Sequence, residues 1–344
     1  MRVAVDAQLT VGTATGIGEY VRGLIDALET QDVDVIELSE PKLDPWRFDR
    51  RVFWDQVLFP QRVRQTAPDV VHCASGTVPL GLTIPYVVTV HDVAWLRVQS
   101  HARPYARYYF GRFSIDRYRR AAAIAVDSAF SREELLSVMP ELDPAIVHVV
   151  YPGVAADFCA IDRKGGDGKT ILAIGTVERR KNLEALIETL PFLERARLIS
   201  VGPYTPYQEE CEGLARALGV ENRVEFRGYV PRSEVLELCS TAAVIAVPSL
   251  YEGFGYAAAQ AMCAGVPAVV SDQASLPEIV GDGARIVPAT DVQQWIKALD
   301  VALQGEDDAR AQAGRAAAIE RFSWENSARD MLAAYKIAFD LSKG

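Results

Sequence analysis

The sequence is poor in cysteine and has no long hydrophobic run. Its five cysteines among 344 residues are scattered, without the paired spacing of a zinc site or a disulfide framework, and are typical of free thiols in a reducing compartment. No apolar stretch reaches the ~18 residues that a membrane-spanning helix needs. A predicted strand begins at Arg2, so we expect no signal peptide and a cytoplasmic protein.

Positive charge is also in short supply. The 36 lysines and arginines are outnumbered by 46 aspartates and glutamates, which gives a formal net charge of −10. A nucleic-acid-binding protein normally needs a basic face, so we expect no nucleic-acid partner. The hydrophobic fraction of 49% and the charged fraction of 24% are ordinary for a globular protein, and the length suffices for two domains.

Two binding signatures are missing as well. No Asp-x-Asp pair stands at the carboxyl end of a predicted strand, so we expect neither a metal nor another cofactor. Gly12, Gly16 and Gly18 lack the G-x-G-x-x-G spacing of a dinucleotide fingerprint.

What the sequence does contain is a repeated alternation of strands and helices. Such alternation predicts an α/β fold with parallel sheets covered on both faces. We interpret it as two Rossmann-like domains facing across a cleft, which is the default ligand site. The predicted strands are residues 3–5, 33–38, 70–72, 86–90, 124–126, 170–174, 198–201, 224–226, 244–247, 268–270 and 285–287, and helical periodicity marks residues 17–28 and 132–139.

The domain boundary is predicted from a polar, glycine-rich stretch at residues 162–168. It separates an N-terminal domain, residues 1–163, from a C-terminal domain, residues 169–322. Residues 323–344 contain an amphipathic helix from Trp324 to Leu341. That helix either caps the second domain or crosses back to the first.

Residues 247–267 carry the strongest functional signal. A strand runs into the turn Glu252, Gly253, Phe254 and Gly255, and a helix of small residues follows at once. Backbone N–H groups at a helix N-terminus favour an anion. A carboxylate beside an anion site is repelled by the bound anion unless it binds a neutral, hydroxyl-rich part of the same ligand. A phosphorylated sugar offers both an anion and hydroxyl groups, so Glu252 indicates such a ligand.

Other polar residues stand at predicted strand ends. Arg180 and Lys181 begin a helix after strand 170–174, where cations are disfavoured unless an anion joins them. His91 and Asp92 follow strand 86–90, where a cleft would open. The alternatives are a solvated basic turn for the cations, a structural histidine, and a turn cap for Asp92.

Five segments together resemble glycosyltransferase family 4. They are residues 247–267, Gly-Thr-Val-Glu-Arg-Arg-Lys-Asn at 175–182, Thr-Gly-Ile-Gly-Glu-Tyr at 15–20, Val-His-Asp at 90–92 and Tyr-Pro-Gly-Val at 151–154. The resemblance implies a retaining, nucleotide-sugar-dependent enzyme of the GT-B fold. The segment at 175–182 is most similar to the bacterial mannosyltransferase branch, which uses GDP-mannose.

The resemblance also implies roles for single residues. His91 would contact the transferred sugar, Arg180 and Lys181 the diphosphate, and Glu252 the sugar hydroxyls. The donor would further contact Thr176, Tyr229, Val230, Ser249, Leu250, Gly253, Phe254 and Gly255, and Gly16, Ile17 and Gly18 would approach the donor phosphate or the acceptor.

One position departs from the family pattern. Gln260 stands where the family usually has a second glutamate that holds the nucleotide ribose. A neutral amide loses the charge-assisted part of that hydrogen bond, which predicts weaker nucleotide binding or a changed donor.

Residues 97–120 are rich in arginine and aromatic side chains. Such a segment could lie on the inner face of an anionic membrane or bind a lipid-linked acceptor. Alternatively, its aromatic rings pack inward.

Our first hypothesis is a glycosyltransferase of polysaccharide biosynthesis that moves a hexose, in the first place mannose from GDP-mannose, onto a saccharide or lipid-linked acceptor. The alternatives are a non-catalytic paralogue that binds nucleotide sugars, which Gln260 motivates, and a nucleotide-sugar epimerase on the same scaffold.

Overall fold

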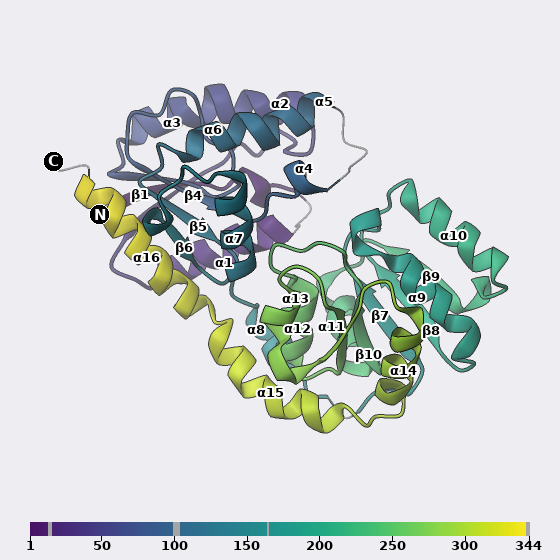
Figure 1. Ribbon diagram of the computed structural model, residues 1–344. Helices are drawn as coiled ribbons and strands as arrows, with labels where there is room; N and C mark the ends of the chain where they lie inside the picture. The colour runs from purple at the N-terminus through teal and green to yellow at the C-terminus, as the bar shows by residue number, and fades with distance from the viewer. Residues whose placement is uncertain (13–15, 99–103, 164, 342–344) are drawn as a thin grey trace. The chain divides into compact units, whose positions relative to one another are not determined.

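The computed structural model describes residues 1–12, 16–98, 104–163 and 165–341. The chain forms two compact units (Figure 1). Unit 1 comprises Met1–Gly153 and Ser323–Gly344, and unit 2 comprises Val154–Phe322.

Unit 1 is built on a six-stranded parallel sheet in the order β2-β1-β3-β4-β5-β6. The central strands are buried along their whole length, as parallel strands covered on both faces must be. The strands are β1 (Arg2–Asp6), β2 (Asp34–Leu38), β3 (Val70–Cys73), β4 (Tyr86–Val90), β5 (Ala123–Val126) and β6 (Val147–Val149). The helices are α1 (Gly16–Leu28), α2 (Phe48–Phe53), α3 (Phe59–Thr66), α4 (Ala94–Arg97), α5 (Pro104–Arg107), α6 (Ser114–Tyr118), α7 (Ala129–Val138) and α16 (Trp324–Leu341).

The C-terminal helix α16 belongs to unit 1 and packs against α1 and strands β3, β4 and β5. Trp324, its first residue, lies against Gly23 and Gly153, where an added Cβ would meet the indole at 2.3 Å. Deeper in the helix, the Tyr335 hydroxyl bonds to Nδ1 of buried His72 at 2.8 Å. Two close-packing glycines and one buried hydrogen bond therefore fix this helix to the N-terminal sheet.

Unit 2 repeats the architecture, with a parallel sheet in the order β12-β11-β10-β7-β8-β9. The strands are β7 (Thr170–Ile174), β8 (Arg197–Val201), β9 (Val224–Gly228), β10 (Val244–Val247), β11 (Ala268–Ser271) and β12 (Arg285–Val287). The helices are α8 (Ala156–Cys159), α9 (Leu183–Thr189), α10 (Tyr207–Ala217), α11 (Arg232–Thr241), α12 (Tyr256–Ala264), α13 (Leu276–Val280), α14 (Val292–Leu303) and α15 (Asp308–Arg321).

The passage from unit 1 to unit 2 falls before the polar stretch 162–168. Helix α8 already belongs to unit 2. Within the stretch, the guanidinium of Arg163 donates to the carbonyls of Ala242 (2.6 Å) and Ala243 (3.3 Å), and its side chain is 2% exposed. These hydrogen bonds attach Arg163, and with it the stretch, to unit 2, although the composition of the stretch is typical of a linker.

Candidate functional site

A buried carboxylate held by two cations forms the centre of the site in unit 2. Lys181 Nζ donates to Glu252 Oε1 at 2.5 Å, and Arg180 Nη1 donates to Glu252 Oε2 at 3.0 Å. The Ser249 hydroxyl also donates to Oε1, at 2.7 Å. Glu252 is 6% exposed, whereas about a quarter of each cationic side chain is accessible (24% and 25%). Lys181 therefore presents positive charge outward over a buried carboxylate, while Arg180 also pairs with the partly exposed Glu178 at 2.8 Å.

The environment keeps Glu252 ionised. Burial by itself would raise its pKa, but the charges of Lys181 and Arg180 and the hydrogen bonds outweigh burial and lower the pKa to about 2. A carboxylate in this state can only accept hydrogen bonds. Glu252 is thus suited to accept bonds from hydroxyl groups as well as from its cationic neighbours.

Backbone hydrogen bonds hold the cationic turn against the Glu252 loop. The short helical turn η5 (Arg179–Lys181) lies between β7 and α9, and its Arg180 carbonyl accepts from Leu250 N–H at 2.7 Å. Asn182 ends the turn in the left-handed conformation, and its side-chain amide donates to the carbonyls of Pro248 and Ala289, each at 3.1 Å. Asparagine tolerates this conformation better than most residues, so the local sequence specifies the turn.

Glycines allow the close approach of backbone that the site needs. At Gly202, which follows β8, an added Cβ would lie 1.9 Å from the Gly175 carbonyl oxygen. Gly255 has φ of +89° at the start of α12, and its Cβ would meet Leu276 at 2.7 Å. The Ser275 hydroxyl secures the same loop by donating to the carbonyls of Glu252 and Phe254. The backbone around Glu252 is therefore fixed from several sides.

The other predicted donor-contacting residues of unit 2 lie at strand ends or at the start of α12. Thr176 follows Gly175 after β7, and Tyr229 and Val230 follow β9, whose last residue accepts a hydrogen bond from Gly202 N–H. Tyr229 is 57% exposed and Leu250 43% exposed, which leaves both accessible to a ligand. Gly253 and Phe254 are buried in the loop itself.

Gln260 is 7% exposed in the middle of α12. Among the residues that the structure describes, no side-chain hydrogen bond joins Gln260 to Glu252. The two side chains therefore do not form one hydrogen-bonded cluster.

His91 lies in unit 1 at the end of β4. Its Nδ1 bonds to Asp127 Oδ2 at 2.7 Å and its Nε2 to the Ala74 carbonyl at 3.0 Å. Both partners can accept a hydrogen bond, an arrangement that favours a proton on each ring nitrogen. Burial lowers the pKa of His91, but the charge of Asp127 and the two hydrogen bonds outweigh burial and raise it overall. The two bonds hold the ring in one orientation, with the Tyr20 ring edge-on at 4.9 Å.

Asp127 was missed by the sequence reasoning, although a signal was present. It directly follows β5, the strand beside β4, so two polar residues stand at the carboxyl ends of neighbouring strands. Asp92 has a different place: its carboxylate accepts from Ala94 N–H at 2.9 Å, as expected for a turn cap. Gly16, Ile17 and Gly18 open α1 in the same unit as His91. Residues 13–15 lie outside the described part of the chain.

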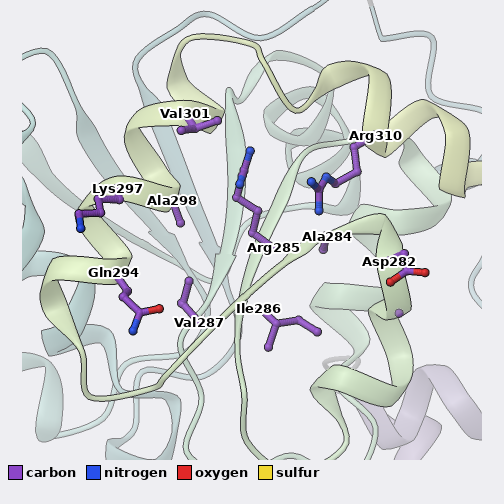
Figure 2. Close-up of a pocket in the computed structure, with 11 residues that line it drawn as sticks. Asp282, Ala284, Arg285, Ile286, Val287, Gln294, Lys297, Ala298, Val301 and Arg310 are labelled. Carbon is purple, nitrogen blue, oxygen red and sulfur yellow. The ribbon is translucent and has the colours of Figure 1, made fainter.

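A cavity of about 420 Å³ elsewhere in unit 2 contains none of these residues. It lies along the edge strand β12 beside α14 and α15, and Figure 2 shows Arg285, Lys297 and Arg310 around it. The two arginines are already paired with Asp307, whose side chain is 4% exposed. This cavity is therefore separate from the Glu252 cluster.

The predicted membrane segment forms α5, the π-helical turn η3 (Tyr108–Phe113) and α6 within its described part. Some rings pack inward: Tyr109 is buried and donates to Asp55 at 3.0 Å. Others remain outside, with Tyr105 47% and Tyr108 60% exposed. Within the described residues, no helix combines the length and apolarity required to cross a bilayer.

Two Rossmann-like units, one of which presents cations and a buried carboxylate at its strand ends, define an α/β protein suited to a phosphorylated, hydroxyl-rich ligand. Comparison with known families is specific. Residues 14–158 match the profile of Glycosyltransferase Family 4, and residues 159–319 match that of glycosyl transferases group 1. The chain belongs to this glycosyltransferase family, whose two-domain architecture is the GT-B fold.

Individual relatives agree with this assignment. The chain is 33% identical over 172 residues to the O-antigen chain mannosyltransferase B of Escherichia coli, covering 48% of this chain and 45% of the relative. It is 28% identical over 292 residues to the MMP alpha-(1->4)-mannosyltransferase of Mycolicibacterium hassiacum, covering 78% and 71%. Among solved structures, a sucrose-phosphate synthase of Thermosynechococcus elongatus superimposes with a TM-score of 0.77 at 22% identity, covering 99% and 100%.

Proposed function

We propose that this protein is a retaining glycosyltransferase that transfers mannose from GDP-mannose to a saccharide or lipid-linked acceptor. The observation that carries the proposal is the Lys181–Glu252–Arg180 cluster, which combines partly exposed cations with an ionised carboxylate. The choice of mannose is supported by the names of the two mannosyltransferase relatives, the first of which matches over less than half of its length.

In this proposal the cations act on the leaving group. Negative charge builds up on the nucleoside diphosphate as the glycosidic bond breaks, and fixed cations at that point lower the barrier. Lys181 and Arg180 are held in place by Glu252, so little reorganisation is needed when the donor binds. Glu252 would then also accept hydrogen bonds from the sugar hydroxyls. The same two cations would supply the charge that a metal supplies elsewhere, so we propose a metal-independent reaction.

The test is Lys181→Ala, assayed with GDP-mannose and a panel of other nucleotide sugars. Turnover, followed as donor hydrolysis or transfer, should fall at least ~10-fold, which corresponds to about 1.4 kcal/mol of transition-state stabilisation. Arg179→Ala is a matched control in the same turn, because its guanidinium pairs with Glu210 rather than Glu252. Equal kinetics for the Lys181 variant and the native protein would remove the diphosphate role.

A non-catalytic nucleotide-sugar-binding protein is the second candidate, because residue 260 is a neutral, buried glutamine. Binding of GDP and GDP-mannose without turnover of any donor would support it. Gln260→Glu should tighten GDP binding if this side chain faces the ribose, since a charged acceptor forms a stronger hydrogen bond. An unchanged dissociation constant in calorimetry would place the ribose elsewhere.

We also propose that unit 1 contacts an anionic membrane through a surface formed by Trp46, Phe53, Val57, Tyr105 and Tyr108. These side chains are 46–60% exposed. Phe53 and Val57 are one helical turn apart. The Tyr105 ring packs on Phe48 of α2 with 4.6 Å between ring centroids, and this contact joins the segment that contains Tyr105 and Tyr108 to α2. The exposed Arg112 and the half-buried Arg50 and Arg107 lie in the same segments. Apolar rings flanked by arginines suit an anionic lipid interface.

Co-sedimentation with phosphatidylglycerol vesicles tests the membrane proposal. Phe53→Ser should reduce the bound fraction, whereas Phe192→Ser, which removes an even more exposed ring from unit 2 (63% against 47%), should leave it unchanged. Equal binding by both variants, or equal binding to neutral phosphatidylcholine vesicles, would contradict it.

A further inference from the structure

Two of the five cysteines lie together at the junction of three helices in unit 2. Cys159 is the last residue of α8, and Cys263 lies in the last turn of α12, which packs against α8. The two side chains interact directly. Cys159 is partly exposed and Cys263 is buried, so Cys159 is the member of the pair nearer to solvent.

Arg315 of α15 holds the backbone of both cysteines. Its Nε donates to the Cys263 carbonyl at 3.1 Å, and its Nη2 donates to the carbonyls of Cys159 (2.7 Å) and Ile161 (3.0 Å). A second contact secures α8, because Arg232 Nη2 donates to Asp157 at 2.7 Å. One guanidinium thus bonds to the backbones of both cysteines and holds these backbones close together.

The electrostatic surroundings make the two thiols unequal. The interaction with the Cys263 side chain and the nearby Arg315 charge lower the pKa of Cys159 below its ordinary value. The same interaction, together with burial, raises the pKa of Cys263. Burial also raises the pKa values of Cys211 and Cys239 to about 12. Because the thiolate is the reactive form, Cys159 is the thiol of unit 2 best suited to react first.

We propose that Cys159 and Cys263 are an oxidation site, at which a hydroperoxide forms a reversible disulfide between α8 and α12. The Cys159 thiolate attacks the terminal oxygen of the hydroperoxide, the O–O bond breaks, and the departing alkoxide or hydroxide takes up a proton. This step leaves a sulfenic acid on Cys159. The Cys263 sulfur then attacks the Cys159 sulfur, the S–S bond forms, and water leaves with the Cys263 proton. Two thiols and one hydroperoxide give one disulfide, one alcohol or water, and one further water.

The place of this pair gives the oxidation a structural consequence. Helix α12 begins at the Glu252 loop and carries Cys263 in its last turn, so a disulfide would covalently tie the helix beside the candidate donor site to α8. A second thiol, such as dithiothreitol, would restore the reduced pair by thiol–disulfide exchange.

The experiment is peptide mapping of the full-length protein after treatment with hydrogen peroxide. Free thiols are then alkylated, and the chain is digested without reductant. We expect one linked peptide pair that joins Cys159 to Cys263 and disappears with dithiothreitol, while Cys73, Cys211 and Cys239 are recovered alkylated. Failure to find the linked pair while Cys159 remains alkylatable, or linkage of Cys159 to several cysteines in similar amounts, would overturn the proposal.

Two variants separate the steps. Cys263→Ser removes the second thiol, so Cys159 should stop at the sulfenic acid and be labelled by dimedone. The matched control Cys211→Ser should retain the disulfide, because Cys211 is buried at a different place in unit 2. Loss of the disulfide in the control variant would contradict the pairing. The readout is chemical and does not depend on glycosyl transfer, so its outcome is independent of the proposed function.

Discussion

The hydrogen-bond partners of His91 influence the protonation of its ring. A neutral histidine would offer one donor and one acceptor, but both ring nitrogens here face acceptors, Asp127 and the Ala74 carbonyl. This arrangement favours the imidazolium form, whose positive charge is balanced by the buried carboxylate of Asp127. Oδ1 of Asp127 accepts no hydrogen bond from any described residue, so the pair rests on the single bond to Oδ2.

Replacing Asp127 with asparagine should lower the pKa of His91, because both the charge and the charge-assisted hydrogen bond are lost. NMR titration of the histidine ring protons measures this shift, and His148, whose pKa responds to burial and Arg132, is the internal control. The native pKa is raised above the ordinary value of ~6.5, so the pair stabilises the fold fully below that pH and loses this contribution as pH rises through the native pKa. The difference in unfolding free energy between native and variant should shrink over that range. A His91 titration that is identical in both proteins would contradict this reading.

At the scale of the element, α16 is held by a buried chain of polar groups. Tyr335 bonds to His72 Nδ1, His72 Nε2 bonds to Thr89 at 2.8 Å, and the Thr89 hydroxyl bonds to Tyr20 at 3.0 Å. Burial lowers the pKa of His72 to about 3, so this histidine is neutral, unlike His91. This series of hydrogen bonds connects α16, β3, β4 and α1 within unit 1.

Tyr335→Phe should therefore destabilise unit 1. The substitution keeps the packing but leaves one nitrogen of His72 buried without its partner, which costs about 1–3 kcal/mol. Denaturant unfolding measures the loss, and the exposed neighbour Lys336→Ala should change stability little. If both variants unfolded at the same denaturant concentration as the native protein, the hydrogen bond would contribute nothing to docking.

The elements themselves were largely predictable, because their patterns are local. Strands 86–90, 170–174 and 244–247 were predicted with the bounds that the structure shows, since each is a short run of mainly apolar residues. Strand β6 was missed: it has three residues, lies at the sheet edge, and has a histidine at its centre.

The site was predictable only in part. Glu252 and the cations of residues 180 and 181 could be inferred because each follows a strand. For the pairing of His91 with Asp127, the sequence offers only a polar residue after each of two neighbouring strands, which does not specify the contact. The docking of α16 on His72 joins residues far apart in the sequence, and no local pattern specifies it.

At the scale of the whole molecule, the chain passes between the two units twice. The passages fall at Gly153–Val154 and at Phe322–Ser323, so unit 1 is completed by the last helix of the chain. Each unit has its own parallel sheet and its own buried core. A ligand that binds one unit stabilises that unit by mass action, and local opening in the other need not change.

GDP should therefore slow hydrogen exchange mainly in unit 2. Most of the proposed nucleotide contacts, Arg180, Lys181 and Ser249 among them, lie there. A ligand at 100 times its dissociation constant stabilises its binding partner by about 2.7 kcal/mol. Exchange followed by mass spectrometry should show protection of residues 175–182 and 249–260, with little change in strands β1–β5. Lys181→Ala should remove the protection at the same GDP concentration, whereas Arg179→Ala should retain it. Protection that appears first in unit 1, or that survives in the Lys181 variant, would mean that the nucleotide binds outside the Glu252 cluster.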